Sequence, residues 1–286
     1  MSSYRFCRTD DIGLLVDALN RCWLPYFPEH GPETAATFKR SIRDLQVWCS
    51  SCMVAFAGSD PMGVLIGAKR PTGTLIHKIA VHPDHLRQGH GRHLLESLGS
   101  KLAILGPPRM IAEVPESLDA GCALFSACGY VEEAVLTDYT LDSHAFAASR
   151  APRADSAPAG SSRWMIIPVT VDDLAANDLL GPTAGSWSRS VETLTARKDE
   201  VSGLAVVLDE QIEAYILYVQ HEIVALRALV QDGGERLGHL LQHLPPGPEL
   251  EFRKVHPSEI ANDLLESLGF RPGVRYRLFA TTARAA

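Results

Sequence analysis

The sequence predicts an α/β (α+β) fold divided into two domains. The chain has 286 residues, about twice the length of a typical domain. Its hydrophobic content of 46% is sufficient for packed cores. The predicted order of strands and helices in residues 4–142 recurs in the second half of the chain. We therefore expect domains at 1–142 and 163–286, joined by a linker over 143–162 that offers little apolar surface to bury.

Apolar periodicity and turn residues define the elements of the first domain. Helices are expected after the acidic cap Thr9–Asp11, over 34–45, after Gly89 and over 118–128. The predicted strands are 4–8, 53–57, 63–68, 75–81, 110–114 and 131–141.

The second half repeats this order with low sequence identity, which indicates an internal duplication. Helices are expected to open at Val171, to cover 236–244, and to run from Pro257 to Leu268. The predicted strands are 164–169, 204–208, 212–219, 223–230, 250–255 and 274–280.

Composition excludes several classes of protein. A net charge of −7 argues against a nucleic-acid-binding surface, which normally carries a basic excess. Neither a signal pattern nor an apolar run of membrane-spanning length is present, so we expect a cytoplasmic protein without a membrane partner. The six cysteines should then be reduced. Cys49 and Cys52 form one CxxC pair without a second, so no metal is expected.

One stretch carries the strongest chemical signal. A predicted strand over 75–81 is followed by Pro83, a glycine loop over 87–92, and an apolar helix. Gly89 and Gly91 let the backbone approach a ligand closely and direct several N–H groups toward one point. The first N–H groups of a helix lack internal partners and lie at the positive end of its dipole. The loop therefore predicts a phosphate site.

This stretch resembles the acyl-CoA-binding motif of the GNAT acyltransferase superfamily, Gln/Arg-x-x-Gly-x-Gly/Ala after a strand ending in apolar-Val-x-Pro. Ala80–Pro83 matches the strand end, and Gly89 and Gly91 match both glycines. The first motif position departs from the pattern, because it holds Leu86, with Arg87 one place later. The resemblance covers 4–142, and the repeated element order extends it to a tandem GNAT chain.

The resemblance implies a mixed, mostly antiparallel central sheet flanked by helices in each domain. It also implies acetyl-CoA as cosubstrate, no metal, and transfer of the acetyl group to a primary amine of a small molecule or peptide by direct attack. The chain would act as a monomer, with its two domains as a pseudo-dimer, or as a homodimer. The implied acyl-CoA contacts are Ile79, Ala80, Val81, Arg87, Gln88, Gly89, His90, Gly91, Arg92 and Phe125.

His77 is the candidate catalytic residue. In a regular strand residues 75, 77, 79 and 81 share one face, and His77 is the titratable residue among them. Its spacing to the glycine loop resembles that of a histidine in the arylalkylamine N-acetyltransferases. An imidazole with an unperturbed pKa near ~6.5 suits deprotonation of the amine. The alternative is a structural histidine satisfied by backbone groups.

Two further expectations follow from the resemblance. Many GNAT enzymes place a tyrosine, acting as general acid, four residues before the glycine that ends the fourth helix; here that position is Phe125, which cannot donate a proton. The thiolate then leaves unassisted or another residue serves. Trp23, Tyr26 and Phe27 lie where the family forms the acceptor wall, although such a segment can also be simple core.

The second copy has a weaker loop, Gln231–Gly238. Aligning Gly238 with Gly91 places Arg236 where Gly89 should be, and Asp232 and Glu235 add negative charge beside the expected pyrophosphate. We therefore expect a degenerate C-terminal domain. Two other functions stay open: a non-catalytic acyl-CoA-binding or regulatory GNAT-like protein, and a nucleotide-binding protein.

Overall fold

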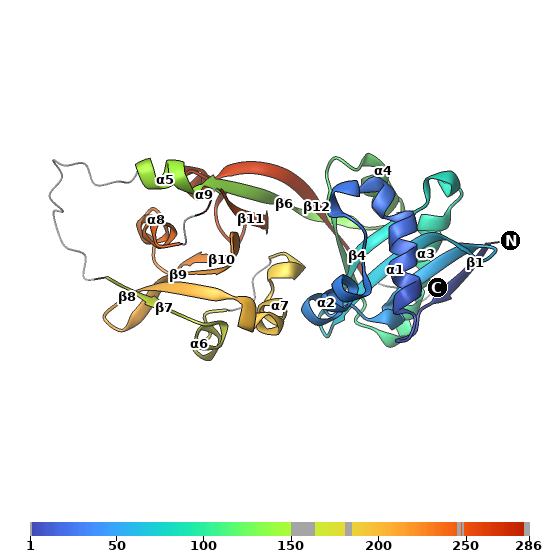
Figure 1. Cartoon of the computed structure of the whole chain (residues 1–286), viewed down its shortest axis with the longest axis horizontal. Helices are drawn as coiled ribbons and strands as arrows, with labels where there is room; N and C mark the ends of the chain where they lie inside the picture. The colour runs from blue at the N-terminus through green and yellow to red at the C-terminus, as the bar shows by residue number, and fades with distance from the viewer. Residues whose placement is uncertain (1, 150–163, 181–184, 245–246, 248, 283–286) are drawn as a thin grey trace. The chain divides into compact units, whose positions relative to one another are not determined.

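The computed structural model describes residues 2–149, 164–180, 185–244, 247 and 249–282 (Figure 1). Of the predicted linker, Ser143–Ser149 form helix α5, and residues 150–162 lie outside the described part. The chain divides into two compact units, Met1–Ala134 with Arg277–Ala286, and Val135–Tyr276. These units differ from two contiguous halves, because each takes a strand segment from the other half of the sequence.

The N-terminal unit is built on a mixed sheet whose neighbouring strands are mostly antiparallel, as predicted. The strand order is β1 (Ser2–Phe6), β2 (Met53–Ala57), β3 (Asp60–Arg70), β4 (Gly73–Val81), β5 (Arg109–Pro115), the end of β12 (Arg271–Thr282) and the start of β6 (Val131–Asp142). Helices α3 (His90–Leu105) and α4 (Asp119–Ala127) share one apolar cluster with β2–β5, which we call the α3–α4 cluster. Helix α1 (Ile12–Cys22) packs against β3 with other buried side chains, and α2 (Ala35–Leu45) contacts α1.

Strand β4 contains a one-residue bulge at His77. Against β3, Lys78 pairs with Ile66 while Ile76 pairs with Gly67, so His77 is the inserted residue. Ile76 and Ile79, three residues apart, consequently both pack against the α3–α4 cluster. The expectation that residues 75, 77, 79 and 81 share one face is therefore wrong, because the bulge shifts the alternation of faces. His77 and Lys78 lie side by side in sequence between two residues that face the cluster.

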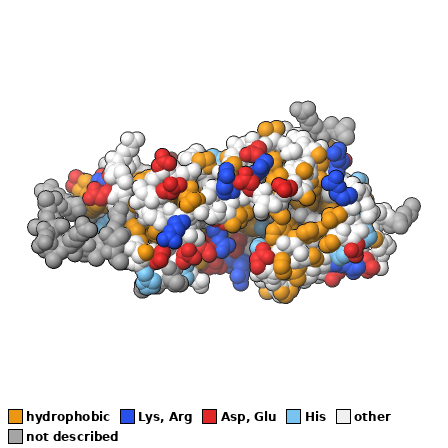
Figure 2. Space-filling model, turned by 90° about the horizontal axis from the view of Figure 1, so that it is seen from above, with side chains coloured by type: hydrophobic (Ala, Val, Ile, Leu, Met, Phe, Trp, Pro, Cys, Tyr) orange, Lys and Arg blue, Asp and Glu red, His pale blue; other side chains and the backbone are white. Residues whose placement is uncertain are grey.

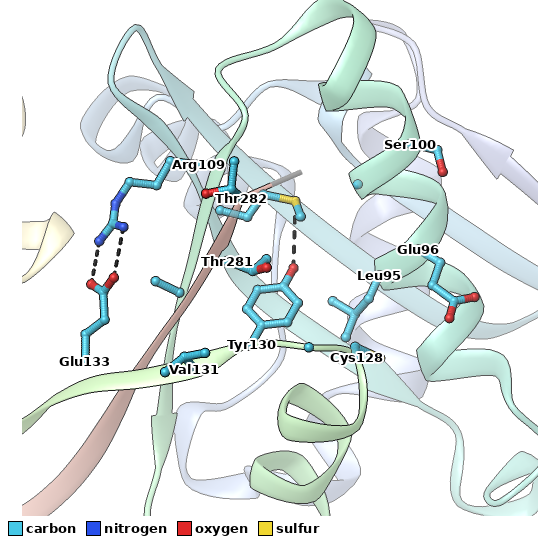
Figure 3. A pocket seen from close by; sticks show the side chains of 14 residues that line it. Leu95, Glu96, Ser100, Arg109, Cys128, Tyr130, Val131, Glu133, Thr281 and Thr282 are labelled. Atoms are coloured by element: carbon cyan, nitrogen blue, oxygen red, sulfur yellow. Dashed lines mark hydrogen bonds and ion pairs between the residues drawn. The ribbon is translucent and has the colours of Figure 1, made fainter. Parts of the chain in front are cut away.

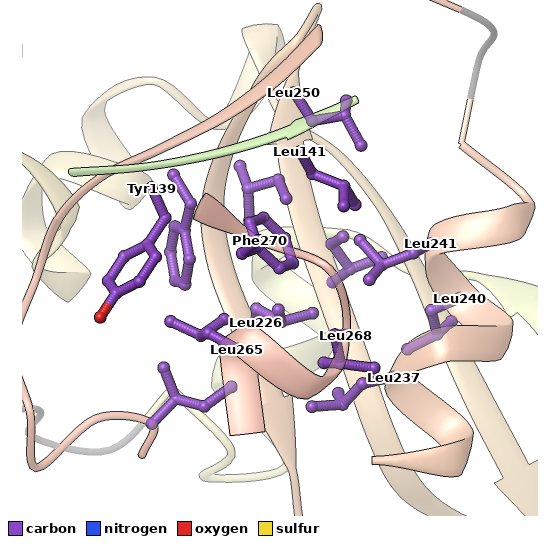
Figure 4. Packing of buried hydrophobic residues seen from close by; sticks show 14 of the residues in the cluster. Tyr139, Leu141, Leu226, Leu237, Leu240, Leu241, Leu250, Leu265, Leu268 and Phe270 are labelled. Atoms are coloured by element: carbon purple, nitrogen blue, oxygen red, sulfur yellow. The ribbon is translucent and has the colours of Figure 1, made fainter. Parts of the chain in front are cut away.

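The C-terminal unit repeats this architecture. Its strand order is β12, β6, β11 (Glu249–Val255), β10 (Glu222–Ala228), β9 (Gln211–Val219), β8 (Ser202–Leu208) and β7 (Met165–Pro168). The helices are α6 (Val171–Ala176), α7 (Val191–Ala196), α8 (Glu235–Gln242) and α9 (Asn262–Ser267); α7 was not predicted from the sequence. In Figure 4, leucines of α8 and of the α9 segment converge on Phe270, Tyr139 and Leu141. These residues form one buried cluster.

The exchanged strand segments carry core residues. Phe279, near the end of β12, is 2% exposed within the α3–α4 cluster, where its ring lies 5.8 Å from that of Phe125. Tyr139 and Leu141, from the second half of β6, belong to the core of the C-terminal unit. Neither half of the sequence therefore completes its own core.

The charge distribution on the surface and the hydropathy of the helices can be compared with the expectations from composition. On the face shown in Figure 2, acidic and basic side chains are interspersed and form no basic stripe. Within the described ranges, no helix is both long and apolar enough to cross a membrane.

Candidate active site

The N-terminus of α3 forms an open turn made by two left-handed residues. Gly89 is the N-cap residue with φ of 85°, no side chain caps the helix, and Arg87 has φ of 62°. A side chain at Gly89 would meet open space but would be strained by this backbone conformation. Arg87, Gln88 and Arg92 are exposed around the turn. Arg92 forms an ion pair of 3.9 Å with Glu96, one turn further along the helix. The uncapped N–H groups at the start of α3 thus lie at an accessible point, which suits a bound anion.

Gly91 is required for a different reason. A Cβ atom built on Gly91 would lie 3.0 Å from Cδ2 of Leu124 in α4. The glycine therefore lets α4 pack closely against the first turn of α3. The sequence pattern placed both glycines at the loop correctly but could not separate these two roles.

His90 contributes its backbone to the turn, while its side chain faces inward. The ring is 7% exposed, and its Nδ1 lies 2.6 Å from the hydroxyl of Tyr4. Burial, together with the charges of His85 and His93, lowers the pKa of His90. A neutral, buried imidazole supports the loop rather than contacting a phosphate directly. Among the described residues, no group of three or more potential metal ligands is found.

Strands β4 and β5 diverge beside this turn. They pair in parallel at Thr74↔Met110 and Leu75↔Ile111, and further along β4 continues to pair with β3 up to Val81. The β5-facing edge of Ile79, Ala80 and Val81 is thereby left beside the gap between the strands. Free N–H groups on such an edge are suitable donors to a thioester oxygen. The carbonyl oxygen of Val81 already accepts a hydrogen bond of 2.7 Å from the hydroxyl of Tyr26.

Of the three residues of the predicted acceptor wall, Trp23 lines a small cavity, and Tyr26 and Phe27 are not among its lining residues. Trp23 and Phe27 stack with ring centroids 4.2 Å apart, and Trp23 lines a cavity of about 190 Å³. Lys78 and Glu33, which the sequence analysis did not select, line the same cavity and form an ion pair of 2.8 Å. The signal for Lys78 was available, since it is a charged residue in an otherwise apolar strand next to His77.

Phe125 is a core residue of the α3–α4 cluster. Its side chain is 2% exposed and packs edge-on against Tyr130, at 5.0 Å, and parallel to Phe279. The apolar residues that surround it explain why phenylalanine occupies the position.

A second cavity in this unit, of about 770 Å³, shares no residue with the glycine turn. Figure 3 shows Leu95, Glu96 and Ser100 of α3 on one side and the Arg109–Glu133 ion pair on the other. The hydroxyl of Tyr130 contacts the sulfur of Met110 at 3.7 Å, and burial raises the pKa of Tyr130. This cavity has neither a phosphate turn nor the bulged strand.

In the corresponding turn of the C-terminal unit, the side chain of Asp232 occupies the helix N-terminus. Gly234 is the N-cap of α8 with φ of 86°, so Gly234 corresponds to Gly89 and Arg236 to Gly91. The alignment of Gly238 with Gly91 was therefore wrong by two residues. Asp232 accepts the backbone N–H groups of Gly234 and Arg236, each at 2.9 Å. The carboxylate occupies the place that an anion would take at this helix.

The hydrogen bonds that Asp232 accepts also favour its ionised form. Burial acts to raise the pKa of Asp232, but hydrogen bonds from the Arg236 side chain and from the backbone N–H groups of Arg236 and Gly234 outweigh it and lower the pKa. Arg236 is held in turn by Glu213 at 2.7 Å. A bound pyrophosphate would have to displace this ionised carboxylate.

The C-terminal unit keeps the other features of the site, namely a short parallel strand pair, a bulged strand and a cavity beside the loop. Strands β10 and β11 pair in parallel only at Glu222↔Glu251 and Ile223↔Phe252, and β10 has its bulge at Val224. A cavity of about 410 Å³ lies beside the loop, lined among others by Leu226, Gly233 and Leu264. The C-terminal unit therefore retains the cleft but has an apolar residue at the bulge and a carboxylate at the turn.

The element order, the divergent parallel pair and the glycine turn before a helix define the GNAT fold, and the chain has this fold twice. Residues 14–130 match the family model described as the acetyltransferase (GNAT) family. The N-terminal unit therefore carries the sequence pattern of the GNAT family, and the chain as a whole has the fold of a tandem GNAT protein. Among curated proteins, none matches this chain.

Several solved structures share the fold across both units. A tandem GNAT protein from the clavulanic acid biosynthesis pathway aligns over 100% of both chains, with a TM-score of 0.60 and 18% identity. A GCN5-related N-acetyltransferase from Sphaerobacter thermophilus aligns over 99% of this chain and 96% of its own, with a TM-score of 0.65 and 15% identity. One from Anabaena variabilis aligns over 99% and 73%, with a TM-score of 0.65 and 12% identity. Identities this low concern the fold alone.

Proposed function

We propose that the N-terminal unit binds acetyl-CoA at the 87–92 turn and transfers its acetyl group to a primary amine of a small molecule or peptide. The observation that carries this proposal is the contrast between the two helix N-termini. The turn before α3 has no side-chain cap and carries the exposed Arg87, whereas the turn before α8 is filled by Asp232. An open site with positive charge favours a pyrophosphate, and a filled site with negative charge opposes it.

In the proposed reaction the amine nitrogen attacks the thioester carbonyl carbon and the carbon–sulfur bond breaks. The edge of Ile79, Ala80 and Val81 is where an N–H donor to the developing oxyanion would lie. His77, in the bulge beside this edge, takes the proton that the ammonium must lose before attack. The thiolate leaves with its electron pair, and the second proton that the nitrogen loses as the amide forms ends on the thiolate sulfur.

The first test is calorimetric titration of acetyl-CoA into matched glycine variants. Gly89 and Gly233 both have positive φ, and a Cβ on either would meet nothing within 4 Å. Valine at either position brings a similar backbone strain, of about 1–2 kcal/mol. We expect Gly89→Val to weaken acetyl-CoA binding at least about tenfold and Gly233→Val to leave it unchanged. Equal losses from the two variants would show that binding does not depend on the N-terminal turn alone, and a loss from Gly233→Val only would place the site in the other unit.

One observation favours a second function, a non-catalytic acyl-CoA-binding protein. The position of the family's usual tyrosine acid holds Phe125, which is buried in the core and donates no proton. Thiol release from acetyl-CoA, measured with a panel of amines, separates the two functions. Tight binding without amine-dependent release would favour the binding protein.

A further inference from the structure

The cavity beneath the 23–33 segment carries one charge of each sign. Lys78 of β4 and Glu33, just before α2, line this cavity of about 190 Å³, and their side chains are only 17% and 14% exposed. Its volume is below the roughly 300–1,000 Å³ of pockets for drug-sized ligands. The cavity therefore suits a small molecule that itself carries both charges.

Glu33 is held rigidly. The side chain of Asn20 accepts the backbone N–H of Glu33 at 2.6 Å and donates to its carbonyl oxygen at 2.9 Å. The Glu33 carboxylate accepts from the hydroxyl of Thr37 through Oε1 and from Lys78 through Oε2. A carboxylate fixed in this way is a preorganised partner for a substrate ammonium.

Lys78 and Trp23, on the cationic side of the cavity, have N–H donors available for a ligand. Among the described residues, the hydrogen-bond partner of Lys78 Nζ is Glu33, and this nitrogen lies 5.9 Å from the ring centroid of Trp23. An ammonium group has three N–H donors. The indole N–H of Trp23 is buried and, within the described part of the chain, lacks a hydrogen-bond partner. A carboxylate oxygen is the kind of acceptor that both groups could use.

We propose that the acceptor is a small zwitterion of the amino-acid class, with its carboxylate bound by Lys78 and its amine directed by Glu33. This inference rests on the proposed acetyl transfer, because it names the acceptor of the same site. The bulge links the two: His77 directly precedes Lys78 in β4, so the proposed base and the proposed carboxylate-binding residue belong to the same irregular part of one strand. An amine without a carboxylate would compete with Lys78 for Glu33 and would offer Lys78 no acceptor in exchange.

The test compares three forms of each acceptor in a thiol-release assay: the free amino acid, its α-amide, and the corresponding decarboxylated amine. We expect the free acid to be acetylated with a kcat/KM at least about tenfold above the other two forms. Equal rates for the three forms would overturn this inference and leave the proposed acetyl transfer standing. The absence of turnover with every compound would overturn both.

Two variants separate recognition from a structural ion pair. Lys78→Met should lower kcat/KM for the amino acid by roughly 10–100-fold and hardly change that for the amine, with acetyl-CoA affinity retained. The double exchange Lys78→Glu with Glu33→Lys keeps an ion pair but reverses its direction, so amino-acid acetylation should stay low. If the double exchange restores the wild-type rate with the free acid, the pair is only structural and the inference fails.

Discussion

The Oδ2 atom of Asp232 accepts both the backbone N–H of Arg236, at 2.9 Å, and its guanidinium group, at 2.8 Å. One carboxylate thereby caps helix α8 and neutralises the arginine that replaces a glycine of the motif. The same helix N-terminus cannot then offer these groups to a phosphate. The two units share a fold but differ in the charge presented at their glycine turns.

Replacing Asp232 with alanine should destabilise the C-terminal unit. The change removes the acceptor of two backbone N–H groups at a helix start, which typically costs about 0.5–2 kcal/mol. Urea unfolding monitored by circular dichroism would measure the loss. A midpoint equal to that of the wild type would show that the capping bonds contribute nothing.

The same carboxylate should make stability depend on acid. The pKa of Asp232 is lowered in the folded state, so its contribution is present above the unfolded pKa of about 3.9 and is lost as pH falls through the folded value. Asp232→Asn should therefore remove part of the stability loss seen between about pH 5 and lower pH. Parallel pH profiles for the variant and the wild type would contradict the prediction.

His77→Gln tests the proposed base while keeping size and hydrogen-bonding capacity. If His77 takes the proton, turnover should fall by roughly 10²–10⁴-fold with little change in acetyl-CoA affinity. The loss should shrink as pH rises, because the free amine then forms without help. Near-normal rates of His77→Gln from acidic to neutral pH would mean that the histidine is structural.

Arg189 and Glu259 form a buried ion pair in the C-terminal unit. Their side chains are 2% and 6% exposed, and Arg189 donates to both carboxylate oxygens, at 2.6 and 2.7 Å. Glu259→Ala should cost about 3–5 kcal/mol, because it leaves a buried guanidinium uncompensated. The exposed pair Lys198–Asp172 is the control, and Asp172→Ala should leave the urea midpoint unchanged. Equal effects of the two changes would refute this assignment.

Phe125→Tyr tests whether the usual tyrosine acid can simply be restored. Because Phe125 is packed between Phe279 and Tyr130, the added hydroxyl would be buried among apolar atoms. We expect a loss of about 1–3 kcal/mol in stability and no rise in kcat. An increase in kcat would show instead that the side chain reaches the leaving thiolate.

The sequence predicted most elements because their signals are local. Apolar periodicity and turn residues located β4 and α3 closely, and the glycines identified the turn between them. The bulge at His77 was missed, because an inserted residue leaves the composition of a strand unchanged while it reverses the faces beyond it. The pairing of Lys78 with Glu33 was missed because 45 residues separate them, and only tertiary packing brings them together.

The turn before α8 also could not be assigned correctly from local sequence signals alone. Counting glycines aligned Gly238 with Gly91, whereas the backbone conformation aligns Gly234 with Gly89. The sequence analysis already treated the negative charge of Asp232 as unfavourable for phosphate. Its direct bonds to the helix N–H groups became apparent only from the geometry.

The placement of Phe279 has a consequence for synthesis on the ribosome. The core of the N-terminal unit includes this residue from β12, a strand that follows the other elements of both units in the sequence. The nascent first half must therefore wait for Phe279, which stacks on Phe125, until β12 has been translated. Folding of the proposed catalytic unit is thus tied to completion of the second copy, even if that copy binds no cosubstrate.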